Sequence, residues 1–131
     1  MPPTQRSTVT TLARTTTDLI GHAETLGLRV VWAADLPERG RWIDGAGVIL
    51  IRHGMTERRT VSTLAHELAH HHYGDGPQTP AIERRAWRWA ARLLVPCDAY
   101  AQAEQYHHSP GAIAQHLGVT TEIIHALQEA A

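Results

Sequence analysis

Two histidines and a glutamate near the middle of the chain, His66, Glu67 and His70, have the types and the spacing that metal-assisted hydrolysis requires. Residues four apart on an α-helix are rotated by about 40° and separated by about 6 Å along the axis, so both imidazoles can reach one metal ion. Imidazole nitrogens are common zinc ligands. Glu67 would lie beside that ion, where its carboxylate can take a proton from a bound water. The pattern therefore predicts zinc ligands at His66 and His70 and a general base at Glu67.

The surrounding sequence decides whether this pattern is accidental, because ten of the 131 residues are His and eight are Glu. The flanks predict one continuous helix over residues 56–73, which would present both histidines on the same side. An apolar stripe lies beside that side, as expected for a helix packed on a core. It consists of Val61, Leu64, Ala65, Leu68 and Ala69. This context favours a metal site over a chance match.

A second helix follows the glycine-rich turn at residues 74–77. Thr79 is a suitable N-cap, Pro80 suits the first helical position, and Pro96 ends the helix. Its core face is formed by Ile82, Ala86, Trp89, Leu93 and Leu94. These signals predict a helix over residues 80–95.

Glu83, near the start of this second helix, is the predicted third zinc ligand. His70 is three residues before the end of the first helix and Glu83 three after the start of the second, so each lies about 4.5 Å along its helix from the connecting loop. If the helices pack antiparallel, the two side chains lie at the same depth. The alternative is a solvated carboxylate that the helix dipole favours at this end of a helix.

Other residues near the motif fit a metal site less well. A metzincin needs Gly at position 73 and His at position 76, where this chain has Tyr73 and Gly76, so that class is excluded. Asp75 is a possible ligand, but its glycine-flanked position favours turn chemistry. His71 and His72 follow the motif directly, and His71 points about 100° away from the preceding histidine on a helix. Neither is expected to bind the catalytic ion.

The segments before the motif predict an α+β fold with a three-stranded sheet beside the metal-binding helix. Residues 7–26 form a predicted helix ended by Gly27, and residues 28–32 a short strand. Residues 40–43 and 48–51 form a predicted hairpin. In compact zinc peptidases the edge of such a sheet can hold an extended peptide by main-chain hydrogen bonds. The sequence does not identify the edge strand.

The last third of the chain predicts short helices that end in a helical hairpin. Asp98 can cap a helix over residues 99–107, and residues 111–124 predict two helices separated by a glycine. The pair looks like a helix-turn-helix, but a hairpin packed on the core gives the same spacing without DNA. The second helix carries Glu122 and Glu129 and no Arg or Lys, so direct nucleic-acid binding is not expected.

Length and composition indicate one domain of 131 residues. Its predicted parts are an N-terminal helix (1–27), a small sheet (28–55), the zinc-site helices (56–96) and the C-terminal helices (97–131). The formal net charge of −1 argues against a broad surface for nucleic acid. The longest aliphatic run, residues 48–51, cannot span a membrane, and the polar start is no signal peptide, so a cytoplasmic protein is expected. The single cysteine, Cys97, is expected to be a small packed residue.

Three runs of the sequence together resemble the ImmA/IrrE family of metallopeptidases, over roughly residues 28–128. The runs are TLAHELAH at 63–70, ERRAWRWA at 83–90 and LLVP at 93–96. The resemblance implies a zincin-like minimal metallopeptidase in which the two motif histidines and the glutamate of an E-x-x-A element, here Glu83, bind Zn²⁺, and Glu67 is the catalytic base. Arg85 stands where some members have a second glutamate, which leaves Glu83 as the candidate ligand.

The resemblance further implies an endopeptidase whose protein substrate is a helix-turn-helix repressor of a phage or mobile element. Cleavage also needs a donor for the developing oxyanion, and the candidates are His107, His108, Tyr100 and Tyr106. Two other functions stay open. One is a zinc-binding anti-repressor that acts by binding alone and does not depend on Glu67; the other is a DNA-binding regulator with a structural zinc.

Overall fold

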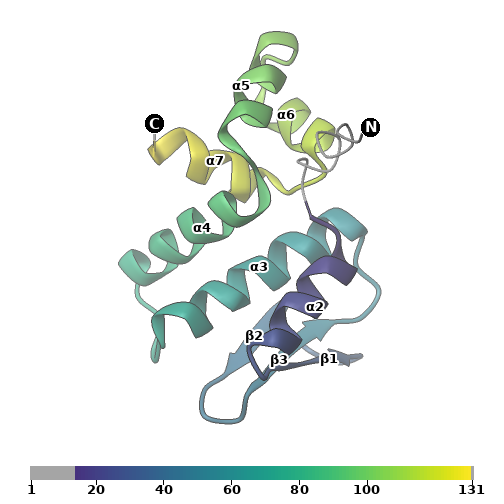
Figure 1. The fold of residues 1–131 in the computed structure, drawn as a ribbon, viewed down its shortest axis with the longest axis vertical. Coiled ribbons are helices and arrows are strands. Elements are labelled where there is room, and N and C mark those ends of the chain that lie inside the picture. Colours follow the sequence, from purple (N-terminus) through teal and green to yellow (C-terminus); the bar gives the residue numbers. More distant parts are fainter. Residues whose placement is uncertain (1–13, 131) are drawn as a thin grey trace, which may run out of the picture.

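A computed structural model describes residues 14–130, and Figure 1 shows a small sheet at one end and a group of short helices at the other, with two longer helices between them. The elements are α2 (Thr16–Thr25), β1 (Arg29–Ala33), β2 (Gly40–Ile43), β3 (Val48–Arg52), α3 (Glu57–Tyr73), α4 (Pro80–Leu94), α5 (Cys97–Tyr106), α6 (Pro110–Leu117) and α7 (Thr121–Ala130). The predicted α+β class with a sheet beside the motif helix is confirmed.

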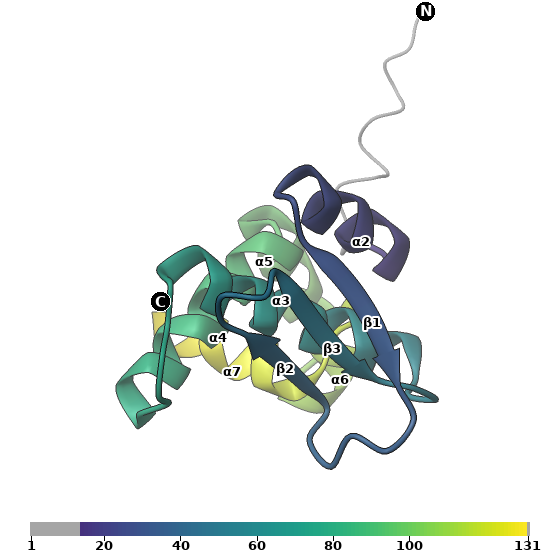
Figure 2. The same cartoon turned by 90° about the horizontal axis from the view of Figure 1, so that it is seen from below.

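The sheet has the order β1-β3-β2, with β1 parallel and β2 antiparallel to the central strand. Alternate residues of a strand face opposite sides, and in β3 the fully buried side chains are Ile49 and Ile51. That face packs on α3, which lies behind the sheet in Figure 2. The predicted hairpin is confirmed, and β1 and β2 are the two edge strands.

Helix α3, the motif helix, begins and ends where its capping residues predict. The Thr56 side chain accepts a hydrogen bond from the Arg59 backbone N–H, and Gly74 ends the helix at a φ of 64°, which glycine adopts without strain. The face made by Val61, Leu64 and Leu68 is buried in the core. This burial fixes the rotation of α3 about its axis and therefore the direction of the motif side chains.

Helix α4 runs back alongside α3 after the turn that joins them, so the two helices are antiparallel neighbours (Figure 1). Thr79 accepts a hydrogen bond from the Ile82 backbone N–H, and Pro80 occupies the first turn, as predicted. The helix ends at Leu94 because a residue before proline, here Val95, disfavours the helical conformation.

Two predictions about helix boundaries differ from the structure. Helix α2 begins at Thr16, where Thr15 and Asp18 form a reciprocal capping box, so the predicted helix is not continuous through residues 14–15. Residues 7–13 of the predicted helix lie outside the described residues. Helix α5 begins at Cys97, with Pro96 and not Asp98 at the N-cap position. The expectation for Cys97 is also wrong, because this first helical residue is exposed.

The last two helices form the predicted helical pair, joined at Gly118, whose φ is 74°. Helix α7 buries Ile123, Ile124 and Ala126 and packs against α4. The pair therefore contributes to the core beside the motif helices. Within residues 14–130, no helix is both long and apolar enough to cross a membrane.

Candidate metal centre

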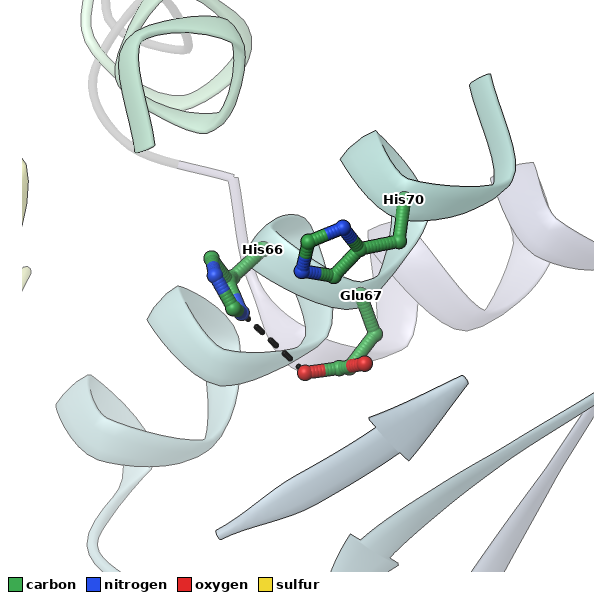
Figure 3. Close-up of side chains that lie close together, drawn as sticks. All are labelled: His66, Glu67 and His70. Atoms are coloured by element: carbon green, nitrogen blue, oxygen red, sulfur yellow. Dashed lines mark hydrogen bonds and ion pairs between the residues drawn. The ribbon is translucent and has the colours of Figure 1, made fainter. Parts of the chain in front are cut away.

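The two motif histidines face each other on the side of α3 that looks toward α4 (Figure 3). Their ring centroids are 4.6 Å apart, and the rings are nearly perpendicular, at 82°. The side chain of His70 is 2% exposed and that of His66 12% exposed. The helical register thus brings both imidazoles to one largely buried place, as the sequence predicts.

Glu83 reaches the same place from α4. Its Oε1 lies 2.8 Å from His66 Nε2, and its Oε2 lies 3.1 Å from His70 Nε2. This contact exists because the antiparallel helices place Glu83 and His70 at matching depth on either side of the connecting turn. Two imidazole nitrogens and one carboxylate therefore converge from two helices.

The other ring nitrogen of each histidine is held by a carboxylate. His66 Nδ1 lies 3.1 Å from Glu67 Oε2, and His70 Nδ1 lies 2.9 Å from Asp75 Oδ2. With both Nδ1 atoms engaged, the Nε2 atoms are left to bind an ion, together with Glu83. Two histidines and one glutamate are one of the donor sets that catalytic zinc sites use, so these residues fit Zn²⁺.

Distance alone suggests a different third donor, because one ligand atom each of His66, Glu67 and His70 lie within 4.8 Å of one another. Glu67, however, contacts His66 from the Nδ1 side, and in Figure 3 its carboxylate lies on the side of the imidazoles that faces the sheet. Glu83 faces both Nε2 atoms. We therefore favour Glu83 over Glu67 as the third ligand.

Three of the histidines each pack against the ring of a tryptophan. Trp87 of α4 stacks on the His66 ring, with centroids 4.2 Å apart and planes inclined by 25°. His71 packs edge-on against Trp42, and His72 stacks on Trp89. The structure thus turns His71 and His72 away from the candidate metal centre, as expected. The sequence analysis did not identify Trp87, although its spacing four residues after Glu83 places it on the same face of α4.

A cavity of about 260 Å³ opens beside His66. Its lining residues are Glu38, Arg39, Gly40, Thr63, His66, Glu67, Glu83, Trp87 and Glu122. None of the four predicted oxyanion donors is among them. Tyr100 lines another cavity near Cys97, Tyr106 is exposed, and His107 lies against His116. The lining side chains with N–H donors beyond the motif are Arg39 and Trp87, which the sequence analysis did not consider.

The burial of Asp75 was not predicted from the sequence. It follows Gly74 in the turn after α3, as expected, but its side chain is only 3% exposed and contacts His70 and Arg85. The left-handed conformation of Gly74 folds the chain back, so that the Asp75 N–H donates to the His70 carbonyl. The sequence signal for this contact is Gly74, which ends the helix four residues after His70. A glycine at that position lets the chain fold back and brings the next residue, Asp75, to the side of His70.

The pKa of His66 is raised to about 9. Burial acts to lower it, but the hydrogen bonds to Glu67 and Glu83 and the negative charges of these carboxylates outweigh burial. The ring is consequently protonated at neutral pH in the chain alone. A metal ligand must be deprotonated, so an ion that binds here has to displace this proton.

Zinc affinity is therefore expected to depend on pH. Below the His66 pKa of about 9, each unit of falling pH protonates more of the free chain, so affinity should fall about tenfold per unit from pH 9 to pH 7 and level off above pH 9. Competition with a chelator of known zinc affinity, repeated across this range, measures the dependence. An affinity that is constant from pH 7 to pH 9 would contradict it.

A small sheet beside a helix with two histidines and a glutamate at this spacing defines a zincin-like fold of the metallopeptidase type. The chain belongs to the IrrE N-terminal-like domain family, peptidase family M78, whose model matches residues 23–126. This match confirms the resemblance found in the sequence.

Among solved structures, the chain is similar to a Mycobacterium tuberculosis transcriptional regulator, with 18% sequence identity and a TM-score of 0.64. The similarity covers 86% of this chain and 40% of that one. It shows a shared fold, and the chain spans less than half the length of that regulator. No curated protein matches the sequence.

Proposed function

We propose that this chain is a zinc-dependent endopeptidase in which His66, His70 and Glu83 bind Zn²⁺ and Glu67 is the general base. The observation that carries the proposal is the approach of both Glu83 oxygens to the Nε2 atoms of the two histidines. The family match supports the same class of reaction. A bound zinc would supply Lewis-acid activation of a water and of the peptide carbonyl.

Glu67 is placed for proton transfer. It lines the cavity that a substrate would enter and touches the ring of one proposed ligand through Nδ1, not through the metal-facing Nε2. From there its carboxylate takes a proton from the attacking water and returns it to the leaving amine. Its side chain is 7% exposed, so few water molecules compete for that proton.

The edge strand β2 is the proposed peptide-binding strand. It pairs with β3 on one side only, and Gly40, its first residue, lines the cavity. A Cβ at Gly40 would lie 2.6 Å from Thr63 Cγ2 and 3.1 Å from Glu67 Cγ, so only glycine lets the strand come this close to α3. An extended peptide that added to the free edge of β2 would lie beside the cavity that Gly40 and Glu67 line.

The charges around the cavity favour a basic protein segment. Glu38, Glu67, Glu83 and Glu122 line it, against a single lining arginine, Arg39, which is paired with Glu122 at 2.7 Å. Counted over the lining side chains alone, negative charge still exceeds positive charge when a doubly charged ion is bound, while Arg41, outside the lining, pairs with Glu38. A DNA-binding domain is rich in Arg and Lys, so we propose a helix-turn-helix repressor as the substrate, in a cytoplasmic setting, consistent with the family resemblance.

Cleavage of such a repressor is the expected result when the purified zinc-loaded protein is mixed with the repressor encoded beside its own gene. Intact mass should show two fragments, and operator binding by the repressor should be lost. Chelation of zinc should prevent both. Loss of operator binding with the repressor intact would instead favour an anti-repressor that acts by binding alone, and operator binding by this chain itself would favour a DNA-binding regulator.

A further inference from the structure

We propose that Asp75 and Arg85 form a positioning pair that holds His70 in the orientation and tautomer needed to bind zinc through Nε2. The inference rests on the proposed function of the site. It assigns a role to two residues that neither bind the ion nor line the cavity beside it.

Asp75 contacts His70 on the side opposite to the proposed ion. Its Oδ2 lies 2.9 Å from His70 Nδ1, while His70 Nε2 faces Glu83. A carboxylate can only accept, so this contact puts a proton on Nδ1, and an ion that binds His70 must then use the lone pair of Nε2, on the side that faces Glu83. The Asp75 side chain and the His70 side chain are 3% and 2% exposed, so water does not offer either one an alternative partner.

Arg85 holds the second oxygen of Asp75. Its Nη2 lies 2.5 Å from Asp75 Oδ1, and its guanidinium carbon lies 3.9 Å from the centre of the Tyr73 ring. Tyr73 and Asp75 flank the turn after α3, and Arg85 comes from α4, two residues after Glu83. Because a buried carboxylate needs a partner, Arg85 satisfies the second oxygen of Asp75 and fixes its rotamer.

The pair gives His70 a support that His66 lacks. The Nδ1 partner of His66 is Glu67, which must itself exchange a proton in the proposed reaction, and the His66 ring is held instead by stacking on Trp87. The Nδ1 partner of His70 has no such second task. One ligand is thus held by an aromatic ring and the other by a dedicated carboxylate and its arginine.

The test measures zinc affinity by chelator competition for the wild type, Asp75→Asn, Asp75→Ala, Arg85→Gln and the double variant Asp75→Asn/Arg85→Gln. Loss of such a carboxylate is expected to weaken zinc binding about 10- to 100-fold, with Asp75→Asn affected less than Asp75→Ala because an amide oxygen can still accept from Nδ1. The backbone bond from Asp75 to His70 remains in every variant, and circular dichroism checks the fold. Arg84→Gln, which removes an exposed arginine next to Arg85, is the matched control and should bind zinc like the wild type.

The double variant shows whether Arg85 acts on zinc binding through Asp75 or independently of it. If Arg85 acts through Asp75, Arg85→Gln should weaken zinc binding in the wild type but add no further loss to Asp75→Asn. Nitrogen-15 spectra of the zinc-loaded wild type should show His70 with the proton on Nδ1, and zinc-loaded Asp75→Ala should lose this preference. A spectrum of the zinc-loaded wild type with the proton on His70 Nε2, unchanged zinc affinity in Asp75→Ala, or fully additive losses would overturn the inference. A wild type that binds no zinc would overturn the proposed function itself.

Discussion

Peptide hydrolysis should fall by at least about 10²-fold when Glu67 is replaced by Gln, while zinc content stays that of the wild type. The amide has almost the shape of the carboxylate and can still contact His66 Nδ1, but it cannot take a proton from water. Rates of substrate cleavage and metal analysis on the same preparation measure both quantities.

Glu38→Gln is the control for this variant, because Glu38 also lines the cavity but is paired with Arg41 at its exposed rim. It should keep most of the activity. Undiminished cleavage by Glu67→Gln would refute the role of Glu67 as the base. If the wild-type protein inactivates the repressor without cleaving it, and Glu67→Gln inactivates the repressor equally well, the protein is an anti-repressor that acts by binding.

The second large effect is expected for Glu83→Ala, which should weaken zinc binding by more than the roughly 10- to 100-fold that loss of a supporting residue costs. Glu83 faces both Nε2 atoms, so its removal takes away a ligand and leaves two histidines. The loss of its negative charge acts in the same direction. Chelator competition at a fixed pH gives the change in affinity.

Glu122→Gln is the control that distinguishes loss of a zinc ligand from loss of a nearby negative charge. Glu122 lines the same cavity but pairs with Arg39, so its replacement removes a nearby negative charge without removing a proposed ligand. Zinc affinity should change little in Glu122→Gln. If Glu83→Ala binds zinc as tightly as the wild type, the third ligand is another residue, and Glu67, which lies near both histidines, becomes the first alternative.

Local sequence determined the elements that carry the chemistry. The relation of His66 to His70 follows from the helical repeat, and Thr56, Gly74, Thr79 and the proline after it fix the ends of α3 and α4 through contacts within a few residues. The hairpin of β2 and β3 was equally predictable, because strand alternation and turn residues are local signals. Where two local signals competed, the capping box prevailed: it begins helix α2 at Thr16, although the apolar pattern predicted a helix continuous through residues 14–15.

Only the tertiary structure decided which side chains meet across elements. The depth of Glu83 was predictable, but its contact with both Nε2 atoms depends on how α3 and α4 pack. Asp75 has the sequence of a turn residue, and its burial depends on Arg85 of another helix. The oxyanion candidates on and after α5 were placed elsewhere because the position of that helix is set by packing against α6, and not by the motif. The sequence thus determined the register of each helix, whereas the packing between helices selected the partners, because such contacts join residues that no local pattern relates.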